Sequence, residues 1–151
     1  MAEKQYVIFK LGREEYGIDI MNVREITEFK ETTKIPNAPN FIEGVINLRG
    51  NVIPVINLKK RFKLDETNIA NNSRIIIVTM DAKQIGFIVD DASQVMTLNE
   101  DEIENPPEII TGIDRKYIVG IGKMDEKIII LLDLVAVFSD EEKNQIVKMD
   151  T

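Results

Sequence analysis

The sequence of this chain matches itself at two offsets, and this internal similarity limits the folds that it can adopt. Sliding the chain by 69 positions places Gly17 on Gly86, and sliding it by 76 positions places Gly44 on Gly120. Two consecutive blocks therefore recur in the same order, which is typical of a duplicated structural unit. The alternative is that two β-rich halves of similar composition match by chance. A duplication predicts two small β-barrels, because closure of a sheet protects its free edges.

Residues 41–62 contain a complete β-hairpin. The β-branched runs VINL and VIPVINL flank Arg49, Gly50 and Asn51, which we assign to a tight turn because Gly50 can adopt a positive φ. This turn places the Arg49 guanidinium at the tip of a rigid hairpin. Pro54 lacks a backbone N–H, so its strand is expected to lie at a sheet edge or to carry a bulge.

The remaining pattern is mainly β. Asn99 and Glu102 form a capping-box signature for a short acidic helix that Pro106 and Pro107 would end. The polar stretch 63–73 is the best internal boundary, so we expect one subdomain over residues 12–70 and a second over 71–151, with the first strand pairing with either. Expected strands are 5–11, 15–18, 23–29, 45–48, 52–58, 74–80, 83–89, 93–98, 118–124 and 127–132, and expected helical segments are 58–62, 133–138 and 140–147.

Composition excludes most catalytic chemistry. The chain has no Cys and no His, which removes thiolate nucleophiles, imidazole bases and zinc–thiolate sites, so an enzyme would depend on carboxylates and lysines alone. Its 26 acidic and 19 basic residues give a net charge of −7, which disfavours nucleic acid and anionic membranes as partners. The basic triplet at 59–61 fits a solvated helical turn better than a nucleic-acid site. No signal peptide or membrane span is evident, so we expect a cytoplasmic protein. Because the residues offer no catalytic or metal-binding motif, we also expect a non-enzymatic protein without a cofactor or metal.

The segments EEYGIDIMNVREI and EGVINLRGNVIPVINL resemble the CheW family of bacterial chemotaxis coupling proteins, and the similarity covers roughly residues 5–138. This resemblance implies two five-stranded SH3-like β-barrels that pack side by side around a shared core. It also implies an adaptor that couples the cytoplasmic tips of methyl-accepting chemoreceptors to the regulatory domain of the histidine kinase CheA, in receptor arrays at the inner face of the membrane.

The resemblance also suggests which residues contact the receptor. By position these are Val23, Glu25, Arg49, Ala92 and Val95. A forked guanidinium on a rigid turn suits bidentate recognition of a carboxylate, which independently favours Arg49. The alternatives are an exposed turn arginine without a role, or an internal ion pair with Glu25 or Glu43. Valines at strand spacing are equally typical of a core.

For the kinase, the resemblance points to Val7 and Ile20, although a valine within a strand can equally be buried. Gly44 and Gly50 are expected to matter as backbone geometry at the hairpin. Two other functions stay open: a coupling module from a larger protein with a phosphorylatable receiver, or a small β-barrel that binds nucleic acid or acts as a hydrolase. The chain's end at Thr151 favours a free-standing adaptor over the first, and the charge and missing His oppose the second.

Overall fold

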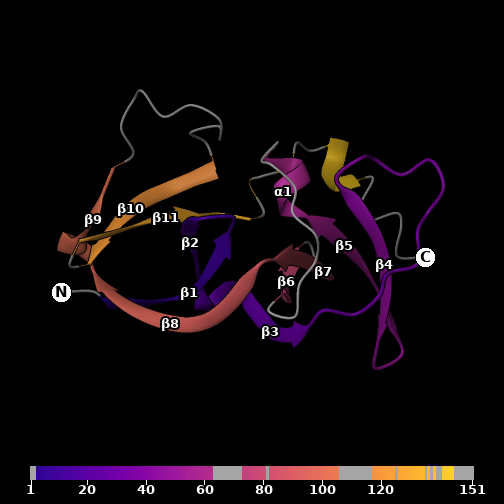
Figure 1. Ribbon diagram of the computed structural model, residues 1–151, viewed down its shortest axis with the longest axis horizontal. Coiled ribbons are helices and arrows are strands. Elements are labelled where there is room, and N and C mark those ends of the chain that lie inside the picture. The colour runs from indigo at the N-terminus through magenta and orange to yellow at the C-terminus, as the bar shows by residue number, and fades with distance from the viewer. Residues whose placement is uncertain are drawn as a thin grey trace.

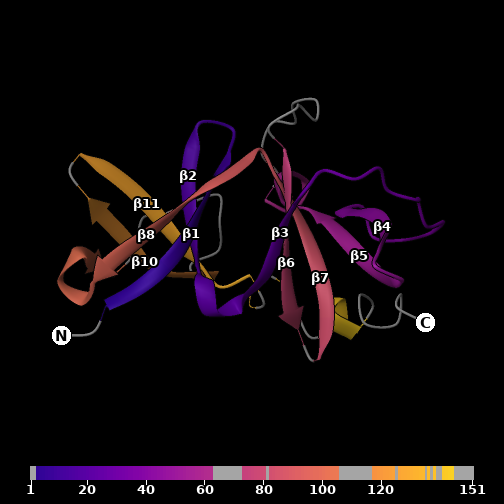
Figure 2. The same ribbon diagram turned by 90° about the horizontal axis from the view of Figure 1, so that it is seen from below.

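The computed structural model describes residues 3–62, 73–80, 82–105, 117–124, 126–134, 136, 138 and 141–144. They form two curved sheets that lie side by side (Figures 1 and 2). Sheet A has the strand order β8-β1-β2-β11-β10-β9, and sheet B has the order β3-β6-β7-β5-β4. The predicted fold class, mainly β with two similar subdomains, is confirmed.

Most of the predicted strands form within two residues of their expected bounds. The strands are β1 (Glu3–Leu11), β2 (Glu14–Asp19), β3 (Val23–Glu28), β4 (Ile42–Leu48), β5 (Asn51–Asn57), β6 (Arg74–Met80), β7 (Lys83–Val89), β8 (Asp91–Asn99), β9 (Ile103–Glu104), β10 (Ile118–Met124) and β11 (Lys127–Leu132). The short helices are the 3₁₀ turns η1 (Ile20–Asn22) and η2 (Glu100–Glu102) and the α-helical turn α1 (Leu58–Arg61), and residues 141–144 are also helical.

Strand pairing in the two sheets follows the offsets found in the sequence. In sheet A, β8 pairs antiparallel with β1 and sets Val95 opposite Val7. In sheet B, β3 pairs antiparallel with β6 and sets Ile26 opposite Ile76. A shift of 69 positions converts one pair into the other, so the repeat extends to the register of the strands.

Each sheet also contains one parallel pairing. Leu131 of β11 lies opposite Gly17 of β2, and Val55 of β5 lies opposite Gly86 of β7. Shifts of 76 and 69 positions relate these two pairs. A Cβ on Gly17 would lie 2.9 Å from Leu131 Cδ2, so the glycine lets the Leu131 side chain pack closely on the β2 backbone inside the curve of the sheet.

The first hairpin of each repeat belongs to the sheet of the other repeat. Hairpin β1–β2 joins β8, β10 and β11, whereas β6–β7 joins β3, β4 and β5. The predicted ranges 12–70 and 71–151 therefore do not coincide with the sheets. The physical reason is that the parallel pairings, β2 with β11 and β5 with β7, complete each sheet across the expected boundary.

The core has three parts, and this arrangement explains the uninterrupted apolar runs. Alternate residues of β1 face the interior of sheet A and a large cluster shared by both sheets, so the strand is buried on both faces. Strand β6 does the same in sheet B. Stacked aromatic rings contribute to this shared cluster, and the ring centroids of Phe87 and Phe138 lie 6.0 Å apart. The shared cluster includes Val7, Phe9, Leu11, Tyr16, Ile18, Phe41, Ile56, Phe62, Ile76, Val78, Phe87, Tyr117, Leu132 and Phe138.

Pro54 does not lie in an edge strand, because β5 runs between β7 and β4. Pairing of β5 with β7 begins only at Val55, and the opposite residue Val45 bonds to Thr33 through both backbone groups at 2.9 Å. The missing N–H of Pro54 therefore interrupts no ladder. A register shift does occur, but it lies on β4 between Ile42 and Gly44.

Two predicted helices differ from the structure. The capping box forms, with the Asn99 N–H donating to Glu102 Oε1 at 2.8 Å. However, the helix is a single 3₁₀ turn that ends at Glu102, and Ile103 pairs with β10 before the prolines are reached. Residues 134 and 136 are turn residues instead of part of the expected helix 133–138. Residues 141–144 are helical as expected, and the two prolines and residues 140 and 145–147 lie outside the described residues.

Candidate functional site

The β4–β5 turn holds Arg49 in an uncommon backbone conformation. Leu48 pairs with Asn51, so the loop contains only Arg49 and Gly50, and Asn51 belongs to the strand instead of the expected turn. Both loop residues have positive φ, 52° and 87°, as in the two-residue type I′ hairpin. The Gly50 N–H donates to Asn47 Oδ1 at 2.9 Å, which fixes the tip further.

At this tip Arg49 makes a bidentate ion pair with Glu25 on β3. Arg49 Nη1 lies 2.6 Å from Glu25 Oε1, and Nη2 lies 2.9 Å from Oε2. The hydrogen bond from Arg49 is the main cause that holds the pKa of Glu25 below its ordinary value, and the charges of Arg49, Arg24 and Lys30 act in the same direction. Of the two internal partners expected for Arg49, the structure selects Glu25.

Glu43, the other candidate, is held elsewhere. Asn57 Nδ2 donates to Glu43 Oε1 at 3.1 Å, and Lys60 Nζ lies 3.5 Å from the same oxygen. The Arg49–Glu25 pair, in contrast, is open to solvent, since 71% of the Arg49 side chain is exposed. Exposed ion pairs contribute little to stability, so an external carboxylate can compete with Glu25 for the fork at low cost.

The other predicted receptor contacts lie on β3 and β8, which run along the same side of the molecule in Figure 1. Among the described strands, each of these two pairs with a single neighbour. Val23 and Ala92 are half-buried and pack against the shared core. Val95 is 54% exposed, and its repeat equivalent Ile26 is 36% exposed. The sequence did not decide whether these valines lie in the core or at the surface. In the structure Val95 is a surface residue and Val23 is half-buried.

The two predicted kinase contacts differ in exposure. Val7 is 2% exposed and belongs to the shared core, so it can support a surface only from below. Ile20 is half-buried at the start of η1, where Asp19 caps the turn by accepting the Met21 N–H at 2.9 Å. Met21 is 86% exposed and was not singled out from the sequence. Its position between the expected strands 15–18 and 23–29 was the available signal.

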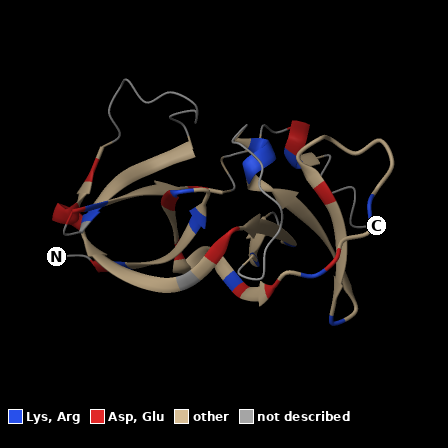
Figure 3. Ribbon diagram, in the orientation of Figure 1, with Lys and Arg blue, Asp and Glu red and all other residues tan. Residues whose placement is uncertain are grey.

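The sequence predicted that the basic triplet at 59–61 is a solvated face, and this prediction is wrong. Lys59 is 5% exposed, and its Nζ lies 2.6 Å from Asp90 Oδ2. Arg61 donates to Tyr117 Oη at 3.2 Å and lies 5.7 Å from three ring centroids. Figure 3 shows this basic turn beside the helical residues 141–144, which begin with two glutamates, and Arg61 donates to Glu142 Oε1 at 3.3 Å. All three cations therefore stabilise the fold.

Within the described part of the chain, no group of three or more acidic, His or Cys residues is placed to hold a metal ion. In that same part, no helix has the length and apolar character needed to cross a bilayer. The structure thus presents an ion-paired arginine and exposed apolar positions on a rigid double sheet. These are features of a protein-binding scaffold.

Comparison with known proteins gives the family. The model of the CheW-like domain matches residues 5–142. The chain is 36% identical over 149 residues to the chemotaxis protein CheW of Treponema pallidum, covering 96% of this chain and 88% of that protein. It is 37% identical over 139 residues to CheW of Klebsiella aerogenes, covering 92% and 84%. The crystal structure of the scaffolding protein TtCheW from Thermoanaerobacter tengcongensis superposes with a TM-score of 0.85 at 44% identity, covering 94% and 92%.

The chain therefore belongs to the CheW family of chemotaxis proteins, which are scaffolds and adaptors and not enzymes.

Proposed function

We propose that this protein couples the cytoplasmic tip of a chemoreceptor to the regulatory domain of the histidine kinase CheA. One surface, formed by Val23, Glu25 and Arg49 with Ala92 and Val95, binds the receptor. A second surface around Ile20 binds the kinase. Two sites on one rigid scaffold raise the effective concentration of kinase at the receptor without any catalytic step.

The observation that carries the receptor site is the exposed bidentate pair of Arg49 and Glu25. The turn fixes the backbone of Arg49 and Glu25 orients its guanidinium, so less side-chain entropy is lost when it meets a partner. The pair joins β3 to the β4–β5 turn. A receptor carboxylate that displaces Glu25 would accept both hydrogen bonds from the Arg49 guanidinium and leave the Glu25 carboxylate in solvent. The exposed Val95 and Ile26 supply apolar area on the same side of the molecule.

The second surface is supported by the exposed Met21 beside Ile20. Both residues lie in the single turn that connects β2 of sheet A with β3 of sheet B. Neither belongs to the strand segments that carry the receptor residues, so the two partners can bind at once. We further propose that the protein acts in the cytoplasm, where receptor tips and the kinase are both accessible.

The test separates recognition by Arg49 from its internal pairing. The isotope-labelled chain is titrated with a receptor-tip fragment and, separately, with the CheA regulatory domain, and both are followed by NMR. Arg49→Glu should weaken receptor binding at least tenfold while the spectrum remains that of a folded protein. The double variant Arg49→Glu with Glu25→Arg restores an internal ion pair and should stay weak if position 49 itself contacts the receptor.

Full recovery of receptor binding in the double variant would contradict direct contact and assign Arg49 a structural role. Ile20→Glu serves as the reciprocal control, and it should weaken kinase binding while receptor binding is retained. Equal losses for both partners in either variant would refute the two-surface arrangement.

A further inference from the structure

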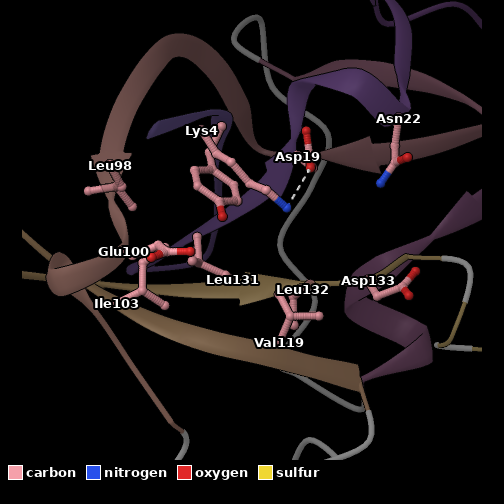
Figure 4. Close-up of a pocket in the computed structure, with 11 residues that line it drawn as sticks. Lys4, Asp19, Asn22, Leu98, Glu100, Ile103, Val119, Leu131, Leu132 and Asp133 are labelled. Atoms are coloured by element: carbon pink, nitrogen blue, oxygen red, sulfur yellow. Dashed lines mark ion pairs between the residues drawn. The ribbon is translucent and has the colours of Figure 1, made fainter. Parts of the chain in front are cut away.

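A hollow of about 370 Å³ opens within the curve of sheet A (Figure 4). Its volume lies within the range of pockets that bind ligands, about 300–1,000 Å³. Buried apolar side chains form its floor, while charged groups surround its opening. The apolar lining comprises Tyr6, Leu98, Ile103, Val119, Leu131 and Leu132.

The repeat shows that this hollow is not a general property of the fold. The 69-position shift places Asp19 on Ile88, which is 6% exposed and belongs to the buried cluster inside sheet B. The 76-position shift places Val119 on Glu43, whose carboxylate bonds to Asn57. Where sheet A has the carboxylate of Asp19, sheet B has the buried Ile88. Where sheet A has the exposed Val119, sheet B has Glu43, which is held by an internal hydrogen bond.

The opening is predominantly acidic. Asp19, Glu100 and Asp133 contribute three carboxylates, and among the described residues that line the hollow Lys4 is the one cation. Lys4 Nζ lies 3.7 Å from Asp19 Oδ2, which is longer than a charge-assisted hydrogen bond of about 2.8 Å, and Figure 4 shows this pair across the hollow from Val119. A cation at the opening would therefore be attracted without having to break a strong internal pair.

Val119 adds an apolar contact at the surface, since it is 57% exposed. The opening also continues into a second depression that Ile20 and Met21 line, with Lys4 and Asp19 common to both. The hollow is thus accessible to an extended segment lying on the protein surface, and its combination of apolar floor and acidic rim specifies what that segment must carry.

We propose that the hollow of sheet A binds a protein segment that inserts one large aliphatic side chain and places a Lys or Arg at the rim. The aliphatic group covers the apolar floor formed around Leu98 and Leu131, and the cation lies among the carboxylates of Asp19, Glu100 and Asp133. This site goes beyond the adaptor surfaces proposed above. It does not depend on them, because its occupant is defined by its chemistry alone.

The test uses the whole chain with methyl-labelled Leu and Val and the peptide acetyl-Gly-Lys-Leu-Lys-Gly-amide, titrated into the millimolar range. The methyl signals of Leu98, Val119 and Leu131 should shift together and saturate. Two matched peptides, one with Ala for Leu and one with Glu for both Lys, should bind at least threefold more weakly. Absence of shifts at these methyls, or equal affinity for the three peptides, would overturn the proposal.

Two variants locate the binding site. Glu100→Lys reverses one rim charge on an exposed residue and should weaken the Lys peptide at least threefold while strengthening the Glu peptide. Glu126→Lys makes the same charge change at an exposed turn outside the hollow and should alter neither affinity by more than twofold. Equal effects of the two variants would attribute the attraction to net charge and refute the site. Asp19→Ile, which supplies the residue found in sheet B, should abolish the methyl shifts.

Discussion

Replacement of Gly44 by alanine tests whether the β4 bulge depends on the absence of a side chain. Gly44 has φ of +151°, and an added Cβ would lie 2.4 Å from the carbonyl oxygen of Thr33. That oxygen accepts the Val45 N–H at 2.9 Å, and the Thr33 N–H donates to the Val45 carbonyl at 2.9 Å. A normal carbon–oxygen contact needs about 3.3 Å, so Thr33 must move by about 1 Å and both bonds stretch beyond hydrogen-bond range.

The magnitude follows from these contacts. Loss of two backbone hydrogen bonds costs about 1 kcal/mol each, and an L-residue in a left-handed conformation costs about 1–2 kcal/mol more, so Gly44→Ala should destabilise the protein by about 3–4 kcal/mol. Gly50→Ala is the matched control, because Gly50 also has a positive φ, +87°, but its Cβ would meet nothing within 4 Å. Only the conformational cost applies there.

Urea unfolding, followed by circular dichroism, measures both variants. With a slope of about 2 kcal/mol per molar urea, the midpoint of Gly44→Ala should lie about 1 M below that of Gly50→Ala. Equal midpoints for the two variants would refute the reasoning, since they would show that the Thr33 carbonyl yields without losing its bonds.

Two further predictions concern ion pairs. Arg49→Ala should raise the pKa of Glu25 toward its ordinary value of 4.5, as measured by carboxyl NMR titration, and an unchanged pKa would contradict the pairing. Because the pKa of Glu25 is lowered in the folded protein, the stability due to this pair is complete above pH 4.5 and is lost as the pH falls through the lowered pKa. Asp90→Asn should destabilise the protein by about 1–3 kcal/mol, because it leaves the 5%-exposed Lys59 without its carboxylate. The double variant with Lys59→Met should regain part of that stability, and fully additive effects in the double-mutant cycle would show that the pair does not interact.

The strands and their registers could be predicted because the information is local and repeated. The 69-position offset that aligns Val7 with Ile76 in the sequence also relates their strand partners, Val95 and Ile26. The ion pair of Arg49 with Glu25 was among the alternatives, but the sequence could not decide between Glu25 and Glu43, because Glu25 lies 24 positions from Arg49. The sequence left open with which subdomain the first strand pairs, and β1 pairs with β8 of the second repeat. The exchange of the complete hairpins could not be predicted, since each parallel pairing joins residues far apart, and both arrangements satisfy the same local patterns.

The surface could be predicted less well than the core. A valine at strand spacing looks the same whether it is buried, as Val7 is, or exposed, as Val95 is, because both strands alternate and only the tertiary arrangement decides which faces are covered. The prediction that the basic triplet at 59–61 is solvated was wrong for the same reason. Its carboxylate partner Asp90 lies 31 positions from Lys59, beyond the reach of any helical spacing rule.

The exchanged hairpins impose an order on synthesis. Hairpin β1–β2 leaves the ribosome first, yet its parallel partner β11, which sets Ile130 opposite Tyr16, comes near the end of the described chain. At about 5–20 residues per second, the hairpin waits roughly 6–20 s for that partner. Sheet B, whose last strand is β7, can assemble earlier. Strand β8 can cover the β1 edge of the hairpin earlier, but the β2 edge stays open until β11 arrives, so the yield in the cell depends on whatever shields that edge in the interval.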